Sequence, residues 1–227
     1  MFFNEVESFR AKRTKSAIQA NYNWRLLGPI GEPSSSRSEH GIGRVNIYSG
    51  FDPTNPDVYW AGSAGGGVWK STNAGRNWFT FPFTQFLSLG VSDIGISPSN
   101  PNIVYVATGD ADGSSATRSP GSIGVIKTTN GGASWTTTNL NFYLLDNKIL
   151  GRLLVDPDDP NIVIVASFDG IYKTIDGGSI WAKKSNGTFI DMEFKTDDET
   201  MYMLPHFPGA APIKYSSPLT RAIHGKK

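Results

Sequence analysis

The chain has 227 residues, with 21 basic and 20 acidic side chains and a formal net charge of +1. This balance excludes a nucleic-acid binder that works through bulk charge, and the lack of cysteine excludes disulfide scaffolds, zinc ribbons and thiol catalysis. The 25 glycines and 14 prolines indicate many tight turns, and the 12% of aromatic residues supplies ample apolar surface for a folded core.

Residues 1–22 are predicted to form a short amphipathic helix that packs on a neighbouring surface. Phe2, Phe3, Val6 and Phe9 recur at helical spacing, and a basic stretch follows them. No apolar run is long enough to span a bilayer, and the first residues lack the apolar stretch of a secretory signal. We therefore expect either a cytoplasmic protein or a chain that lacks its natural start.

Residues 23–227 are predicted to form short strands, and a repeated motif divides them. The motif is Ser/Thr-x-Asn/Asp-x-Gly-x-x-Trp, and its copies are spaced by 57 and then 46 residues. Its residues are Ser71, Asn73, Gly75 and Trp78; Thr128, Asn130, Gly132 and Trp135; and Thr174, Asp176, Gly178 and Trp181.

A second, proline-containing motif precedes each copy, at residues 52–56, 97–101 and 156–160. Four β-rich runs accompany each pair of motifs, the last starting at the tryptophan, which predicts four-stranded propeller blades. The repeats span about 41–85, 90–140, 149–187 and 190–217. In the fourth, Pro218 stands in place of the motif's turn, so this blade is predicted to be degenerate.

The repeated motif is predicted to be a structural turn and not a catalytic one. Glycine adopts positive φ without strain, and the Asn or Asp side chain can accept bonds from N–H groups two or three residues on. The tryptophan is expected to be buried between sheets. Two copies carry Asn where the third carries Asp176, and an amide cannot act as a general acid or base.

The number of repeats predicts part of a larger propeller, because closed propellers need roughly four to eight blades. The segment around Trp24 is similar to the tryptophan-led strand that ends the other repeats, so we interpret it as the closing strand of a final blade. A small four-bladed ring, with Trp24 completing the degenerate blade, is the alternative.

The three motifs resemble the Asp-box, or BNR repeat, of sialidases, endo-xyloglucanases, sortilin-type receptors and photosystem assembly factors. The resemblance covers residues from about 23 to 217. The stretches Ala64–Ser71 and Ala107–Asp110 are also similar to large secreted propeller proteins of Bacteroidetes-type bacteria.

Two hypotheses of hydrolase activity follow from the resemblance. Sialidases imply an arginine triad, and the spacing of Arg25, Arg44 and Arg152 gives no support for one. Endo-xyloglucanases imply an Asp just before the Gly-Gly of the first blade, where this chain has Ala64, a residue that transfers no proton. No catalytic residue is therefore assigned.

Four other residues are candidates for ligand contact. Asp110 and Asp112 open a Ser/Gly-rich insertion that could begin a calcium loop, but the later ligands are missing, so we expect a capped surface loop and no cofactor. Trp60 and Trp69 flank a glycine-rich stretch, where each can pack in the core or stack on a ligand. The histidines His40, His206 and His224 have no metal-ligand spacing.

The sequence thus predicts an all-β propeller that acts as a secreted or cell-surface binding or scaffolding module. Its expected partner is a protein or a glycan, with no nucleic acid and no transmembrane segment. Two alternatives stay open: a divergent xyloglucanase-like glycoside hydrolase with incomplete catalytic residues, and an intracellular assembly factor of the photosystem type.

Overall fold

The computed structural model describes residues 44–49, 52, 54–81, 90–113, 121–194, 201–205 and 213–215. The chain divides into two compact units, Met1–His40 and Gly41–Lys227, and all described residues belong to the second. The helix expected at residues 1–22 and the strand expected around Trp24 lie outside the described residues. No helix in the described part of the chain has the length and apolar character needed to cross a bilayer.

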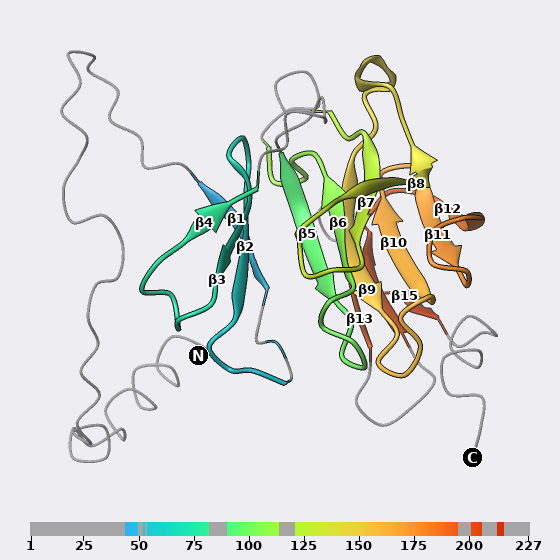
Figure 1. Cartoon of the computed structure of the whole chain (residues 1–227). Helices are drawn as coiled ribbons and strands as arrows, with labels where there is room; N and C mark the ends of the chain where they lie inside the picture. The colour runs from blue at the N-terminus through green and yellow to red at the C-terminus, as the bar shows by residue number, and fades with distance from the viewer. Residues whose placement is uncertain are drawn as a thin grey trace, which may run out of the picture. The chain divides into compact units, whose positions relative to one another are not determined.

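Four antiparallel sheets follow one another along the chain, and in each the strands lie in sequence order (Figure 1). The first sheet contains β1 (Val45–Ser49), β2 (Tyr59–Ser63), β3 (Gly67–Ser71) and β4 (Phe79–Thr80). The second contains β5 (Val91–Ile96), β6 (Val104–Thr108), β7 (Gly124–Thr128) and β8 (Thr136–Asn141). The third contains β9 (Leu150–Val155), β10 (Val163–Ser167), β11 (Gly170–Thr174) and β12 (Ala182–Asn186). The fourth contains β13 (Phe189–Phe194), β14 (Met201–Pro205) and β15 (Ile213–Tyr215).

The first strands of successive sheets contact one another, β1 with β5, β5 with β9 and β9 with β13. Short antiparallel sheets whose first strands lie side by side around a common centre are the blades of a β-propeller. The predicted fold class is therefore confirmed, with three four-stranded sheets and a fourth sheet that has three strands among the described residues.

Apolar clusters fill the spaces between neighbouring sheets. The first cluster joins sheets one and two around Trp60, Val104 and Trp135, and the second joins sheets two and three around Tyr105 and Val163. A third cluster joins sheets three and four. The alternation of strand side chains explains this arrangement, because each inner strand presents one apolar row to the preceding sheet and another to the following one.

In the repeated turn, the Ser or Thr hydroxyl and the Asn or Asp side chain each accept a backbone N–H from four residues further along the chain. Ser71 Oγ accepts the N–H of Gly75 at 2.9 Å, and Asn73 Oδ1 accepts the N–H of Asn77, four residues on, at 2.9 Å. The other two copies repeat both bonds. The predicted range of two or three residues was therefore too short. Each copy carries two consecutive residues at positive φ, and in the first copy one of them is Ala74, at 56°.

The expectation that the motif tryptophans are buried is correct for one copy and wrong for another. Trp135 is 7% exposed and packs on Trp60 and Phe81 of the preceding sheet, at 6.1 and 5.8 Å between ring centroids. Trp181 is half-buried in the second cluster. Trp78, in the first sheet, is 36% exposed. The physical reason is that each of these rings faces the preceding sheet, and the described residues contain no sheet before the first.

Candidate functional site

Two kinds of connection leave the blades at the same end, which we call the mouth. They are the links from the second to the third strand of a sheet and from the fourth strand to the next sheet. The repeated turns and the proline motifs connect strands at the opposite end (Figure 1). All twelve motif residues therefore lie away from the mouth, whereas Trp69, Asp110 and Asp112 lie on elements that reach it.

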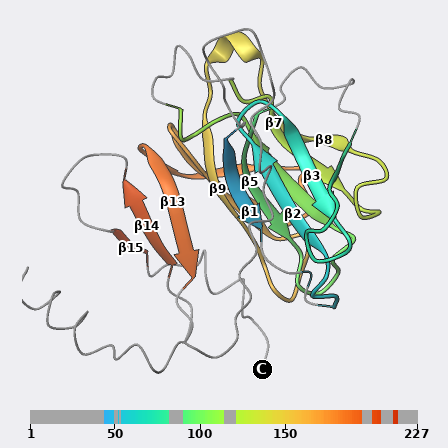
Figure 2. The ribbon, with the colours of Figure 1, turned by 90° about the vertical axis from the view of Figure 1, so that its left-hand side faces the viewer.

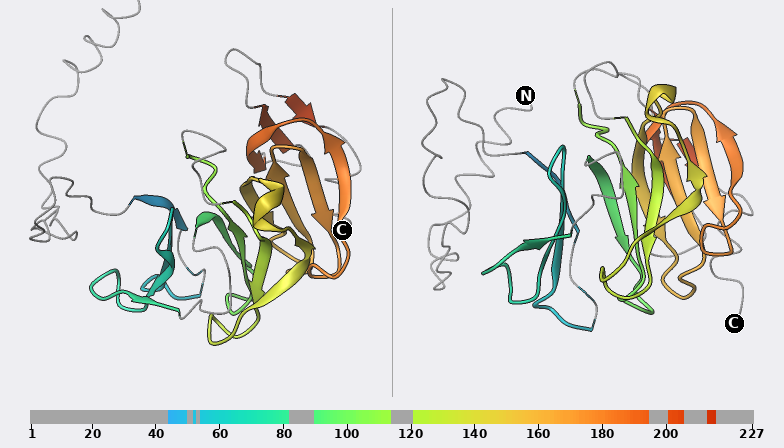
Figure 3. Two further views of the ribbon diagram at one scale, coloured as in Figure 1. Left: turned by 90° about the horizontal axis from the view of Figure 1, so that it is seen from above. Right: turned by 45° about the horizontal axis from the view of Figure 1, so that its top comes forward.

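Backbone hydrogen bonds fix the ends of the mouth connections, within the first and second sheets and between the second sheet and the link to the third. The N–H of Ala64 donates to the carbonyl of Arg44, and the N–H of Gly109 donates to Gly90. Further along, Ser122 donates to the carbonyl of Lys148 at 2.9 Å. Figure 3 shows this end from above. These bonds restrict the backbone of the connections, so side chains carried by them are held at defined positions.

The hairpin of the first sheet places Trp69 beside its own turn. The Trp69 indole Nε1 donates to the carbonyl of Gly66 at 3.0 Å, and Ser63 Oγ accepts the N–H of Gly66 at 3.1 Å. Trp69 is half-buried, and Trp60 is 1% exposed in the first apolar cluster. Ligand contact by Trp60 is thereby excluded, and Trp69 keeps a partly open ring at the mouth.

Asp110 forms a polar tie between the first two sheets. Its carboxylate pairs with the Arg44 guanidinium, and its Oδ1 accepts a hydrogen bond from Asn46 Nδ2 at 2.9 Å. Arg44 also donates to the backbone carbonyl of Asp112 at 3.1 Å. Asp110 is buried, and both of its carboxylate oxygens have partners within this chain. Within the described ranges, no three His, Cys, Asp or Glu side chains lie close enough to hold a metal.

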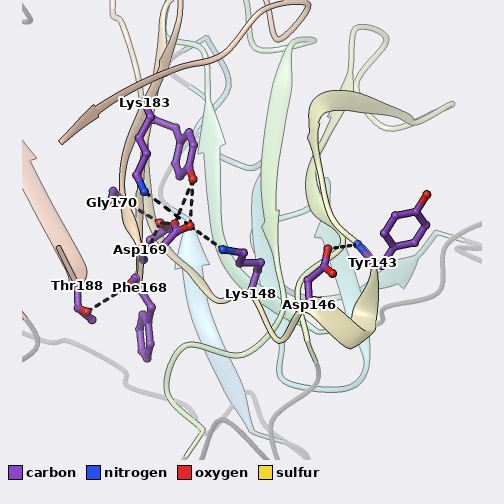
Figure 4. A network of polar contacts seen from close by, with 10 residues as sticks. Tyr143, Asp146, Lys148, Phe168, Asp169, Gly170, Lys183 and Thr188 are labelled. Carbon is purple, nitrogen blue, oxygen red and sulfur yellow. Dashed lines mark hydrogen bonds and ion pairs between the residues drawn. The ribbon is translucent and has the colours of Figure 1, made fainter. Parts of the chain in front are cut away.

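A second polar cluster, around Asp169, lies at the hairpin between β10 and β11 (Figure 4). Lys148 Nζ contacts Asp169 Oδ2 at 2.7 Å, and Ser167 Oγ donates to Oδ1 at 2.6 Å. The Tyr172 hydroxyl donates to Oδ2 at 3.1 Å, and Lys183 Nζ lies 3.9 Å from the same oxygen.

The electrostatics of this cluster keep Asp169 ionised. Partial burial raises the pKa of Asp169, but the hydrogen bonds from Lys148 and Ser167 and the two lysine charges lower it by more, so the net pKa lies below the ordinary value. Burial, then the neighbouring Asp169 charge, raises the pKa of Tyr172 to about 12. Near neutral pH Asp169 can accept a proton or a hydrogen bond, and it has no proton to donate.

A third group lies on the innermost strands. Asp93 of β5 is buried, and its carboxylate accepts the N–H of Leu153 at 2.6 Å and of Ile94 at 2.9 Å. Arg152 Nε lies 3.6 Å from Asp93 and 3.9 Å from Asp191. Burial raises the pKa of Asp93, and Arg152 and the two N–H groups counteract it. Arg44 and Arg152 thus each lie beside a carboxylate of this chain.

Among the described residues of the mouth, the connection from β8 to β9 carries the most exposed aromatic and aliphatic side chains. Tyr143 is 82% exposed and Leu145 is 91% exposed, at and within the short 3₁₀ helix η1 (Leu144–Asp146). Asp146 Oδ2 accepts the N–H of Tyr143 at 3.0 Å, which orders the loop (Figure 4). Lys148, five residues after Tyr143, belongs to the Asp169 cluster.

Sequence reasoning missed Tyr143, Lys148 and Asp169. The available signal was positional: Tyr143 falls between two β runs, and Asp169-Gly170 occupies in the third repeat the hairpin that Ala64–Gly66 occupies in the first. An aromatic or acidic residue in a connection at the mouth end is a stronger candidate than one in a repeated turn.

The sheets, their order and their mouth define a β-propeller, and comparison with known proteins gives a closer relationship. No model of a known protein family matches the chain. A xyloglucanase from Paenibacillus sp is 29% identical over 156 residues, which cover 62% of this chain and 15% of that protein. The xyloglucanase Xgh74A of Acetivibrio thermocellus is 27% identical over 154 residues, with 62% and 18% covered.

A solved structure agrees with the fold. The GH74 xyloglucanase from Xanthomonas campestris superposes with a TM-score of 0.61 at 16% identity, over 78% of this chain and 29% of that one. The chain is thus similar in sequence and fold to part of xyloglucanase propellers. It spans less than a fifth of the length of the curated relatives it matches.

Proposed function

We propose that this chain is a section of a xyloglucanase-like glycoside hydrolase propeller and that its mouth binds a β-glucan chain of the xyloglucan class. The observation that carries the proposal is the similarity to two xyloglucanases over 154–156 residues. The structural neighbour adds that the matched fold is one on which a xyloglucanase is built. A polymeric substrate of this kind does not enter cells, so the proposal places the protein outside the cell.

The mouth has side chains suited to a sugar polymer. The ring of Tyr143 is open to solvent and that of Trp69 partly so, and aromatic faces pack against the apolar faces of sugar rings. Lys148 and Asp169 present charged hydrogen-bonding groups next to Tyr143's loop. In this proposal the repeated turn is an Asp-box that supports the blades from the opposite end.

Hydrolysis requires two carboxylates across the scissile bond. Ala64 stands where the first-blade Asp of the xyloglucanase resemblance would be, and Asp169 is held ionised, so it is unsuited to act as the acid. We therefore expect the isolated chain to bind xyloglucan without cleaving it, the catalytic pair being incomplete in the chain.

Calorimetric titration of the chain with xyloglucan oligosaccharides tests binding. Tyr143→Ala is expected to weaken binding by about 1 kcal/mol, or roughly fivefold in Kd, through loss of an aromatic contact. Ile175→Ala is the matched control, because Ile175 is also an exposed apolar side chain but lies on a repeated turn, and it should leave Kd unchanged. A folded chain that binds no xyloglucan at millimolar concentration contradicts the proposal.

A protein-binding scaffold is the second candidate, and Ala64 is the observation that favours it, because a first blade without its acid need not serve hydrolysis. Pull-down with immobilised chain separates the two candidates when it is run beside the titration. Retention of one protein partner, with no affinity for any xyloglucan oligosaccharide, supports the scaffold and contradicts the glycan proposal.

A further inference from the structure

Two positions of the chain carry an asparagine followed by a glycine, Asn130-Gly131 and Asn186-Gly187. At such a position the backbone nitrogen of the glycine can attack the side-chain carbonyl carbon of the asparagine, because glycine has no side chain to obstruct the approach. The attack requires an asparagine side chain that is free to turn and a glycine N–H that is not held by another acceptor. The two positions differ in both respects in the folded chain.

The first position, in the repeated turn of the second sheet, is held by hydrogen bonds. Asn130 Oδ1 accepts the Thr128 hydroxyl at 2.9 Å and the N–H of Ser134 at 2.9 Å, and Asn130 Nδ2 donates to Ser134 Oγ at 2.8 Å. The N–H of Gly131 donates to the carbonyl of Asn102 at 2.9 Å. Both reacting groups are bonded to other partners, so this turn must open before they can meet.

The second position lies at the mouth and is open. Asn186 is the last residue of β12, and Gly187 begins the link to β13, which Figure 2 shows with β14 and β15 in the fourth sheet. Both residues are exposed, and Gly187 has a φ of +127°, which suits glycine. Within the described ranges, no hydrogen bond holds the Asn186 side chain or the N–H of Gly187.

The backbone on either side of this position is anchored. Asn186 pairs with Gly170 of β11, and the Thr188 hydroxyl donates to the carbonyl of Phe168 at 2.8 Å. Phe189, the first residue of β13, is buried. The reacting groups therefore lie in a short exposed bend between two fixed points, and the attack requires no unfolding of either sheet.

We propose that Asn186 is a site of spontaneous deamidation, with water as the second reactant. The Gly187 nitrogen loses its proton to solvent and bonds to Cγ of Asn186, the bond from Cγ to Nδ2 breaks, and ammonia leaves. The product of this step is a cyclic succinimide. Water then opens one of the two carbonyl–nitrogen bonds of the ring, which gives aspartate or isoaspartate. In sum, the amide and one water become a carboxylic acid and ammonia.

The reaction adds a negative charge to the mouth and lowers the formal net charge of the chain from +1 to 0. The new carboxylate lies one strand away from the Asp169 cluster, because Asn186 pairs with Gly170, the residue after Asp169. Isoaspartate also lengthens the backbone by one atom between the two anchors. The charge of the mouth thus changes with the age of the protein, and this change needs no enzyme.

The test incubates the whole folded chain at mildly alkaline pH, where the Gly187 proton is lost more readily. Trypsin releases the two positions in separate peptides, residues 128–148 and 185–195, and mass spectrometry follows the conversion of amide to acid in each. We expect Asn130 to react at least about a hundredfold more slowly than Asn186, since each hydrogen bond that must break lowers the open fraction roughly fivefold.

Two controls separate the effect of the fold from that of the sequence. In concentrated urea the bonds around Asn130 are lost, so both positions should react at comparable rates. The Asn186→Gln variant should show no conversion at this position over the same period, because a longer side chain does not form the succinimide. Equal rates at the two positions in the folded chain would overturn the proposal. So would an Asn186 that stays an amide in the folded chain while it reacts in urea.

Discussion

Trp135 offers a direct test of the packing between sheets, because Trp78 provides a control at the same motif position. Trp135 is 7% exposed and contacts two aromatic rings of the preceding sheet, whereas Trp78 is 36% exposed. We expect Trp135→Ala to cost about 3–5 kcal/mol of unfolding free energy, the range for a large buried aromatic side chain.

The matched substitution Trp78→Ala should cost less. The difference in exposed fraction, applied to the roughly 250 Å² that an aromatic side chain buries, is about 70 Å², or about 2 kcal/mol at roughly 25 cal/mol/Å². Trp135 also has a second ring partner, which adds about 0.5–1.5 kcal/mol to the difference. Urea denaturation followed by circular dichroism measures both values. Equal losses for the two variants, or a loss under about 1 kcal/mol for Trp135→Ala, would refute the inter-sheet packing.

Three further predictions concern the turns and the Asp169 cluster. Ala74→Gly should stabilise the chain by about 1 kcal/mol in urea denaturation, because Ala74 holds a φ of 56° that glycine adopts without strain, and any destabilisation would show that its methyl group has a role. Gly124→Ala should cost about 2–4 kcal/mol of unfolding free energy, since a Cβ there would lie 1.9 Å from the Leu140 carbonyl oxygen at a φ of +102°. The control Gly65→Ala, at a position with open space around it, should change stability by under about 0.5 kcal/mol. Equal effects of the two substitutions would contradict the described backbone. The pKa of Asp169 is lower in the folded chain than in the unfolded chain, so ionised Asp169 stabilises the fold at pH values above its unfolded pKa. This stabilisation is lost as the pH falls through the folded pKa. The difference in unfolding free energy between wild type and Asp169→Asn should therefore be constant above about pH 5 and shrink below about pH 4. A gap independent of pH would show that Asp169 is not stabilised as an anion.

Much of the fold was predictable because the blade repeats itself in the sequence. Each repeat favours the same local structure, with turns at the motif glycines and proline motifs and strands in the alternating runs between them. Because three copies show the same pattern, their local preferences agree. The start of the fourth strand was predicted to within one residue, at the tryptophan before Phe79, Thr136 and Ala182.

The sequence could not distinguish side chains that share a motif position but differ in neighbours. Trp78 and Trp135 are equivalent in the motif, and only the packed sheets show that one ring has a sheet in front of it. Trp60 and Trp69 are similarly equivalent as exposed-aromatic candidates, until strand register assigns Trp60 to the core.

The mouth was the least predictable part, because its polar contacts join residues far apart in the sequence. Arg44 pairs with Asp110 across 66 positions, and Lys148 pairs with Asp169 across 21. No local pattern encodes such pairs. They arise from connections that leave different sheets at the same end.

Backbone amide NMR spectra recorded during titration with xyloglucan oligosaccharides would test the proposed function most directly. We expect saturable shifts that cluster at the mouth, in residues 63–66, 142–149 and 167–170, with the repeated turns at 72–78, 129–135 and 175–181 unaffected. Saturable shifts confined to the repeated turns, or no shifts in a folded chain, would contradict it.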